Sequence, residues 1–272
     1  MNYLYANRPS YEDFAPGRAL CHAPGMTNFP ARLAEELMGR CLRFLGRREN
    51  VVLYDPLCGV GSLLAVAALT HAPALVRVRG TDADPSAVLV AQKNMALLAP
   101  GGFEDRARTL SEMGERFGRP SYEEAEQAAR RLKELLPGAG IPAEAFAADA
   151  FRLPDDGFRA DVILTDFPYG DMKAWATGGA EGFLAAILPR LNSGGVICAI
   201  MDKKQKLPPS TLQRLERQSV GKRRYEIYRL PPDPHLDEAR AAVVESQKTL
   251  GGGLCASPKT DASSGATGHR RP

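Results

Sequence analysis

The sequence predicts a single α/β domain built around a largely parallel β-sheet. Apolar runs of strand length alternate with apolar-periodic segments of helix length along most of the 272-residue chain. Acidic residues stand at or just after the carboxyl ends of the expected strands. Hydrophobic residues make up 44% of the chain, enough for a sizeable core, which excludes a protein that is disordered throughout. Buried strands that alternate with helices favour a parallel sheet joined by right-handed crossovers.

Composition excludes several classes of protein. The chain carries 35 Lys and Arg against 32 Asp and Glu, and this net charge of +3 does not by itself indicate a nucleic-acid partner. No apolar run approaches the roughly 18–20 residues of a membrane span, and residues 1–20 lack the apolar stretch of a signal peptide. The 5 cysteines form no C-x-x-C pair, and the 4 histidines are scattered. We therefore expect a cytoplasmic protein with reduced thiols, no metal and no membrane partner.

The first expected element is a helix that Pro30 opens and Gly46 ends. Its apolar side chains recur at helical spacing, as is typical of a helix that packs one face against a core. The charged residues of the segment are expected outside this face, namely Arg32, Glu35, Glu36 and Arg40.

Two strands and two further helices follow. Residues 51–54 are a short apolar run that leads into Asp55, which is typical of a buried strand. An apolar helix is expected over 62–71 and a second strand over 75–80. The pair Asp84–Pro85 supplies the N-cap and the first position of the next helix.

Residues from about 101 to 142 interrupt this alternation as an insertion. Ser121 is expected to cap a helix there, because Glu124 lies three residues on and completes a capping box. Glu126 and Arg130 form a favourable i,i+4 pair on this helix. The apolar stripe of the helix is Tyr122, Ala125, Ala129, Leu132 and Leu136.

Alternation resumes after the insertion. Strands are expected over 145–148 and 161–165, each followed by an aspartate, and a helix is expected over 182–191. Gly194–Gly195 is expected to turn the chain into a last buried strand over 196–201.

The chain is expected to divide into three parts. Residues 1–20 form an N-terminal extension, residues 21–230 form the domain with its insertion, and residues 231–272 form a C-terminal tail. In the segment 251–272, 15 of 22 residues are Gly, Ala, Ser, Thr or Pro. Such a segment cannot bury enough apolar surface to fold, so the tail is expected to be largely disordered.

The turn after the first strand is the first candidate binding site. In D-P-L-C-G-V-G, Gly59 and Gly61 let the backbone approach a ligand and present amides at a helix N-terminus. A dinucleotide site is disfavoured, because Leu64 replaces a small residue and Asp55 would repel a pyrophosphate. Asp55 instead suits an ammonium or sulfonium group, and Asp82 suits the two hydroxyls of a ribose. The alternative is an ordinary βα turn with incidental aspartates.

The segment Asp166-Phe167-Pro168-Tyr169-Gly170 is the second candidate site. A carboxylate, a proline that leaves carbonyl acceptors exposed and an aromatic ring would suit a flat base that bears amino groups. In this interpretation Tyr169 stacks on the base, while Asp166 accepts protons from its nitrogen edge. A type I turn after a strand is the alternative.

These motifs together resemble one family of enzymes. The series D-P-x-C-G-x-G, T-D-A-D-P, A-D-A and D-F-P-Y-G resembles class I S-adenosylmethionine-dependent methyltransferases acting on a nucleic-acid base nitrogen. Residues 22–34 and the insert E-R-F-G-R-P-S-Y-E-E-A-E-Q-A-A-R-R-L resemble the avilamycin-resistance ribosomal RNA methyltransferase family. The resemblance runs from about His22 to Arg229, with departures at Leu57 and Val60. It implies a Rossmann-like methyltransferase sheet with helices on both faces, an N-terminal helix and a helical insertion.

The resemblance also implies a reaction and its residues. The reaction would be methylation of a guanine at ring nitrogen N1 in large-subunit ribosomal RNA, with S-adenosylmethionine as the cofactor and avilamycin-type antibiotic resistance as the outcome. The enzyme is expected to act as a monomer. The implied cofactor-binding residues are Asp55, Gly59, Gly61, Asp82, Asp149 and Ala150. Those implied at the target base are Asp166, Pro168 and Tyr169.

A basic stretch near the C-terminus fits an RNA partner. Between residues 203 and 229 there are 9 Lys and Arg against 2 Glu. The residues expected to contact phosphates are Lys203, Lys204, Lys222, Arg223 and Arg224. The alternative for this stretch is the solvated face of an edge hairpin. Two other functions stay open, namely methylation of an exocyclic amino group in tRNA or DNA and RNA binding without catalysis.

Overall fold

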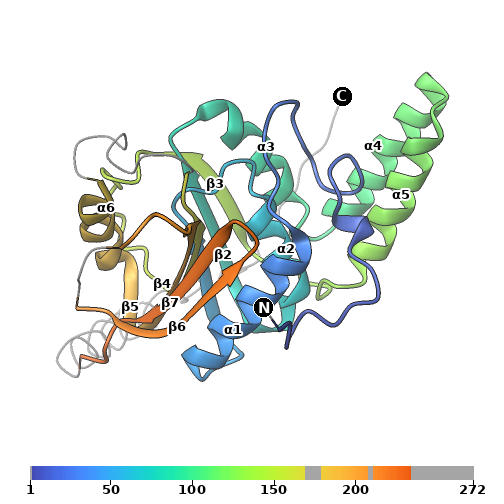
Figure 1. Ribbon diagram of the computed structural model, residues 1–272. Coiled ribbons are helices and arrows are strands. Elements are labelled where there is room, and N and C mark those ends of the chain that lie inside the picture. Colours follow the sequence, from blue (N-terminus) through green and yellow to red (C-terminus); the bar gives the residue numbers. More distant parts are fainter. Residues whose placement is uncertain (1, 169–178, 208–210, 234–272) are drawn as a thin grey trace, which may run out of the picture. The chain divides into compact units, whose positions relative to one another are not determined.

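The computed structural model describes residues 2–168, 179–207 and 211–233, and within them the chain forms a seven-stranded sheet (Figure 1). The strand order is β3-β2-β1-β4-β5-β7-β6, in which only β7 runs antiparallel to its two neighbours. The α/β prediction is confirmed. The strands are β1 (Val51–Asp55), β2 (Leu75–Asp82), β3 (Ala143–Ala147), β4 (Ala160–Asp166), β5 (Leu191–Asp202), β6 (Gln213–Val220) and β7 (Arg223–Arg229).

Helices cover both faces of the sheet. The helices concerned are α1 (Ala31–Leu45), α2 (Ser62–Thr70), α3 (Pro85–Ala96) and α6 (Gly179–Ile187). Leu37 of α1 belongs to the same buried cluster as Leu53 of β1, on the face that α1, α2 and α3 cover. The next residue along the strand, Tyr54, belongs to a second cluster that contains Phe183 of α6. Successive residues of β1 therefore serve opposite cores, as the pleat of a strand requires.

The insertion is a pair of helices, α4 (Gly102–Phe117) and α5 (Pro120–Lys133), which lie side by side as a hairpin (Figure 1). The prediction that Ser121 caps a helix is wrong. Pro120 takes the first helical position instead, and Arg119 is the N-cap residue without a side-chain cap bond. The predicted pair of Glu126 and Arg130 is present at 2.7 Å.

The boundaries around β5 also differ from the prediction. Helix α6 ends at Ile187, a 3-10 turn (Leu188–Arg190) follows, and β5 already begins at Leu191. In the pairing of β4 with β5, Ala160 lies opposite Leu191 and Val162 lies opposite Val196. Gly194 and Gly195 therefore lie in a bulge inside β5. A bulge of this kind is difficult to distinguish from a turn in the sequence, because both favour glycine.

The N-terminal segment covers the face of α1 that was expected to meet solvent. Glu36 is 0% exposed and Arg40 is 3% exposed, so the prediction that they lie outside the core is wrong. One carboxylate oxygen of Glu36 accepts hydrogen bonds from the amides of residues 4, 5 and 6 at 2.8, 2.7 and 3.0 Å. Arg40 donates to the other oxygen of Glu36 at 2.7 Å. These bonds satisfy a carboxylate that would otherwise be costly to bury.

Contacts between residues divide the chain into two units, Met1–Pro232 and Asp233–Pro272. The tail that the sequence predicts to be disordered lies outside the described residues after Asp233. Among the described helices, none combines the length and the apolar character needed to cross a membrane.

Candidate active site

The carboxyl ends of three neighbouring strands bring Asp55, Asp82 and Asp166 together. Asp55 ends β1, Asp82 ends β2 and Asp166 ends β4. Asp55 and Asp166 line one cavity of about 110 Å³, together with Gly59 and the segment Thr27–Phe29. In open parallel sheets this edge is the usual place for a ligand.

The glycine turn after β1 is tied to the end of β2. The amide of Gly59 donates to Oδ2 of Asp82 at 2.8 Å, and the amide of Leu57 donates to Oδ1 of Asp55 at 3.0 Å. Gly59 has φ +51° and Gly61 has φ +73°, in the left-handed region that favours glycine. A side chain at Gly61 would approach the backbone of α3 to 3.2 Å, whereas a Cβ at Gly59 would meet open space. The turn is therefore packed against α3 at Gly61 and open toward the cavity at Gly59.

Asp55 lies in an unusual electrostatic environment. It is only 1% exposed, and its burial, with smaller contributions from Asp82 and Asp166, raises its pKa from 3.8 to about 7. The amide of Leu57 opposes this shift. Three carboxylates at one edge create a site that favours a cationic ligand, because a cation would stabilise their ionised forms.

Asp82 holds two backbone amides and retains further acceptor capacity. Besides Gly59, the amide of Asp84 donates to Oδ1 of Asp82 at 2.9 Å. Each carboxylate oxygen has two lone pairs, so a second acceptor position is left on each oxygen. Asp82 can therefore accept two hydroxyl groups without losing the bonds that orient it.

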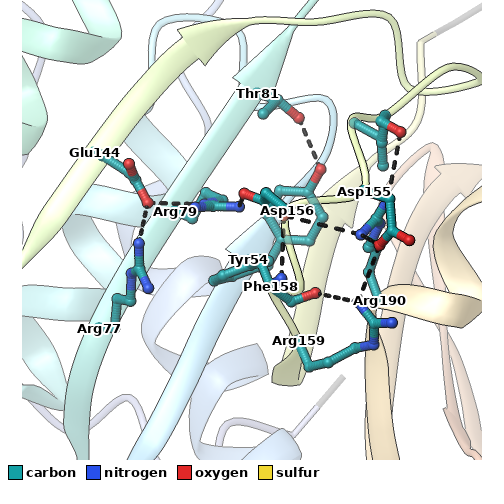
Figure 2. A network of polar contacts seen from close by, with 11 residues as sticks. Tyr54, Arg77, Arg79, Thr81, Glu144, Asp155, Asp156, Phe158, Arg159 and Arg190 are labelled. Carbon is teal, nitrogen blue, oxygen red and sulfur yellow. Dashed lines mark hydrogen bonds and ion pairs between the residues drawn. The ribbon is translucent and has the colours of Figure 1, made fainter.

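Asp149 and Ala150 lie in the segment 148–159, which connects β3 to β4. Asp149 is exposed, and its Oδ1 accepts a hydrogen bond from the amide of Phe151 at 2.9 Å. Ala150 is buried in the same cluster as Tyr54. The amide of Ala148 donates to the backbone carbonyl of Asp82 at 3.0 Å, so this segment begins beside the end of β2. Figure 2 shows the polar contacts that hold its later residues.

The segment after β4 is described as far as Pro168. Asp166 is partly exposed at 21%, while Phe167 is buried against Phe183 with ring centroids 5.1 Å apart. The carbonyl of Pro168 accepts a hydrogen bond from Nε2 of Gln205 at 2.9 Å, so one of its acceptor positions is already used. Tyr169 lies outside the described residues.

The basic residues do not form one surface. Lys203, Lys204 and Lys222 are exposed, as a phosphate contact requires. Arg224 differs from the prediction: it is 4% exposed and faces inward, with Nε 2.9 Å from Glu226 and Nη1 donating to the carbonyl of Lys203 at 3.1 Å. Its charge is used within the domain, and this geometry does not present it to RNA.

Arg223 also has a different environment from the one expected. Its Nη1 lies 3.6 Å from Oδ2 of Asp166, and its guanidinium lies over the ring of Phe29 at 5.4 Å. Since Phe29 and Asp166 both line the cavity, Arg223 belongs to the candidate active site. The residues 223 and 224 point to opposite faces because they are neighbours on strand β7.

Two buried polar residues near the cavity, Ser62 and Asn94, are not predicted from the sequence. The amide of Phe29 donates to the hydroxyl of Ser62 at 3.0 Å, which brings the N-terminal segment against the glycine turn. Asn94 of α3 is 0% exposed and donates to the carbonyls of Cys21 and Val60 at 3.0 and 2.8 Å. A signal was available for Asn94, because it is an amide among the apolar positions of a helix, and such a residue needs partners when buried.

Comparisons with known proteins find one family that matches most of the chain. The family model described as "RRNA methyltransferase AviRa" matches residues 1–223. A 23S rRNA (guanine(2535)-N(1))-methyltransferase of Streptomyces viridochromogenes is 40% identical over 222 residues, which cover 78% of this chain and 88% of that protein. A crystal structure of the rRNA methyltransferase aviRa from the same organism is similar with a TM-score of 0.74 at 38% identity, covering 85% of this chain and 97% of that one. A second crystal structure of aviRa from that organism gives a TM-score of 0.73 with the same coverage.

Proposed function

Since this chain belongs to the AviRa rRNA methyltransferase family, we propose that it methylates N1 of a guanine in large-subunit ribosomal RNA, using S-adenosylmethionine. The observation that carries the proposal is the meeting of Asp55 and Asp166 in one cavity beside the open glycine turn. A cofactor site and a proton acceptor then share one edge of the sheet. The 40% identical relative, whose name gives this reaction, supports the same assignment.

The residues present fit the cofactor. Asp55 would face its cationic methionyl part, and the open space beside Gly59 leaves room for a ligand against the backbone. Asp82 would accept the two ribose hydroxyls, and Asp149 would accept a hydrogen bond from the adenine amino group. When bound, S-adenosylmethionine supplies an electrophilic methyl group on a sulfonium. The protein's main task is to align this group with the acceptor nitrogen.

Asp166 is the proposed general base. Guanine N1 carries a proton at neutral pH, so a base must remove it as the new bond forms. Asp166 is partly exposed at the cavity and can accept this proton on a carboxylate oxygen. Pro168 and Tyr169 would face the target guanine. The guanine must be unpaired or flipped out of a duplex to reach this edge of the sheet.

The exposed lysines Lys203, Lys204 and Lys222 are the proposed phosphate contacts. Their attraction for RNA is independent of sequence, so they would hold the substrate while the cavity selects the base. A ribosomal substrate would place the reaction in the cytoplasm, and we propose that the enzyme acts as a monomer. Resistance to avilamycin-type antibiotics is the proposed cellular outcome.

Reverse transcription of large-subunit rRNA tests the reaction. A methyl group on N1 blocks Watson–Crick pairing, so cells that express the protein should show a stop at one guanine. Cells that express Asp166→Asn should show no stop, because the amide keeps the shape of the side chain but cannot act as the base. A methylated product that is read through, or one confined to tRNA or DNA, would reject ring-nitrogen methylation of rRNA and support the exocyclic alternative.

A further inference from the structure

The connection between β3 and β4 contains no helix, although a crossover between parallel strands usually does. This segment, residues 148–159, carries Asp149 near its start. Without the internal hydrogen bonds of a helix, its position depends on contacts with the rest of the domain. Figure 2 shows that two arginines supply many of these contacts.

Arg79 of β2 holds the end of the segment. It is 7% exposed, and its Nη1 donates to Oδ2 of Asp156 at 2.5 Å while its Nε donates to Oε1 of Glu144 at 2.8 Å. Its guanidinium lies over the ring of Phe158 at 3.8 Å. Burial alone would raise the pKa of Asp156, but hydrogen bonds from Arg79 and from the amide of Phe158 hold it below the ordinary value. Arg79 therefore holds an ionised Asp156 and an aromatic neighbour at once.

Arg190 holds the middle of the segment from the other side. It is 8% exposed, its Nη1 donates to Oδ1 of Asp155 at 3.1 Å, and its Nη2 donates to the carbonyl of Leu153 at 3.2 Å. The neighbouring carboxylates of Asp155 and Asp156 thus bind two arginines from different elements, Arg79 of β2 and Arg190 of the 3-10 turn before β5 (Figure 2). Such an arrangement opposes a shift of the backbone at Asp155 and Asp156.

The start of the segment has attachments of its own, because Ala150 is buried and the ring of Phe151 lies 6.3 Å from that of Phe183. Asp149 is exposed, and its carboxylate receives a local bond from the amide of Phe151. Ahead of it, the amide of Ala148 is bonded to the end of β2. The orientation of the Asp149 side chain therefore depends on where the following residues are held.

We propose that Arg79, acting through Asp156, is a positioning residue that orients Asp149 and so makes the cofactor site selective for adenine. The proposal rests on the assignment of Asp149 to the adenine amino group. A carboxylate in a fixed position accepts a hydrogen bond from that amino group and repels the carbonyl oxygen of a deaminated base. A loosened segment would lose this discrimination more than it loses affinity for the rest of the cofactor.

The test compares the affinities of S-adenosylhomocysteine and its deaminated analogue, S-inosylhomocysteine, by calorimetry on the full chain. Wild type should bind S-adenosylhomocysteine more tightly than S-inosylhomocysteine. The ratio of the two affinities in Asp149→Asn should give the value expected when the carboxylate is absent. Asp156→Asn keeps an acceptor for the amide of Phe158 but loses the ion pair with Arg79. We expect it to reduce the preference at least threefold, with a smaller change in affinity for S-inosylhomocysteine.

Arg77→Ala is the matched control. Arg77 also lies on β2, donates to Glu144 at 2.7 Å and lies over the ring of Phe158 at 5.4 Å, but it is exposed and its ion pair is with Glu144 instead of Asp156. Arg77→Ala should leave the preference for S-adenosylhomocysteine over S-inosylhomocysteine unchanged. If Asp156→Asn does not fold, Arg79→Lys, which keeps the charge without the two-pronged donor geometry, is measured in the same way.

An unchanged preference in a folded Asp156→Asn or Arg79→Lys, even with a lower melting temperature, would overturn the proposal and leave Arg79 a structural residue. If wild type bound neither compound, the proposed function itself would be overturned.

Discussion

Gly59 and Asp82 are joined by a hydrogen bond of 2.8 Å from the Gly59 amide to Oδ2, which connects the turn after β1 to the end of β2. The residue proposed to bind the cofactor ribose therefore also fixes the loop proposed to hold the methionyl part. A single carboxylate that orients two halves of a binding site has a larger effect when removed than its direct contacts with the ligand would suggest.

Asp82→Ala should therefore weaken binding of S-adenosylhomocysteine strongly. Each charge-assisted hydrogen bond lost to the ligand should cost about 1.5–3 kcal/mol, and the freed glycine turn should add to this loss. Calorimetry measures the change. Asp84→Ala is the control, because Asp84 caps α3 through the amide of Ser86 at 2.8 Å and is exposed. It should lower stability through loss of the helix cap with affinity unchanged, and an equal loss of affinity in both variants would contradict the prediction.

Asp55→Asn should stabilise the ligand-free protein at alkaline pH. The folded protein binds the Asp55 proton with a pKa of about 7, against an ordinary value of 3.8. Between these values the folded state holds more protons than the unfolded state, so stability falls as pH rises from about 4 to about 7 and then stays level. Asparagine carries no such penalty. The melting temperature of Asp55→Asn should exceed that of wild type at pH 8 and approach it near pH 4. A difference in melting temperature that stays constant between pH 4 and pH 8 would contradict the raised pKa of Asp55.

Asp55→Asn should bind the cofactor more weakly than wild type, although it should be more stable. A cationic ligand favours ionised Asp55, so wild-type affinity should increase from pH 6 to pH 8 and binding should release a proton near pH 6. Asp55→Asn should bind more weakly at pH 8 and lose this pH dependence. Calorimetry in buffers of different ionisation enthalpy measures the released proton. If Asp55→Asn is more stable than wild type but binds the cofactor more weakly, Asp55 serves binding at the expense of stability.

Some of the site follows from simple rules and some does not. Strand ends with aspartates were sufficient to predict that Asp55, Asp82 and Asp166 meet, because parallel strands end at the same edge. Arg224 is buried although the basic stretch predicts an exposed residue, because a count of basic residues ignores the two-residue alternation of a strand. Glu36 was misassigned because the segment that covers it has no periodicity of its own. Its burial depends on amides 30 to 32 positions away in the chain, which no local pattern reports.

Glu36→Ala should be strongly destabilising. It would remove one of the two carboxylate partners of Arg40, which is 3% exposed and keeps its ion pair with Glu216, and it would remove the acceptor of three backbone amides. Loss of one member of a buried ion pair costs about 3–5 kcal/mol. Glu124→Ala, which removes a surface partner of Arg18 at 2.5 Å, should cost about 0–1 kcal/mol. Urea denaturation of both variants checks the difference, and similar midpoints would contradict it.

Lys222 and Arg224 should give separate outcomes although both are basic. Lys222→Ala should reduce the salt dependence of RNA binding by about 0.7 in slope for one lost single-strand phosphate contact, with stability unchanged. Arg224→Ala should mainly lower stability, because it removes a buried arginine that is the nearest of three arginine partners of the buried Glu226. Binding assays at several salt concentrations and thermal melts distinguish the two. A lower salt slope in folded Arg224→Ala would show that this arginine reaches RNA after all.

Arg223 should affect the methyl transfer itself. Its guanidinium lies 3.6 Å from Asp166 and over Phe29, so it can orient the proposed base toward the cavity before the guanine arrives. Because the pair is partly solvated, its loss should cost about 1 kcal/mol, or roughly a fivefold fall in kcat for Arg223→Ala. Affinity for S-adenosylhomocysteine and the salt slope of RNA binding should stay near wild type, since the guanidinium of Arg223 is engaged with Asp166 and Phe29. Arg223→Lys keeps the charge and should recover much of the rate. Single-turnover methylation with saturating RNA measures this step, and a reduced salt slope with an unchanged rate would return Arg223 to the RNA-binding surface.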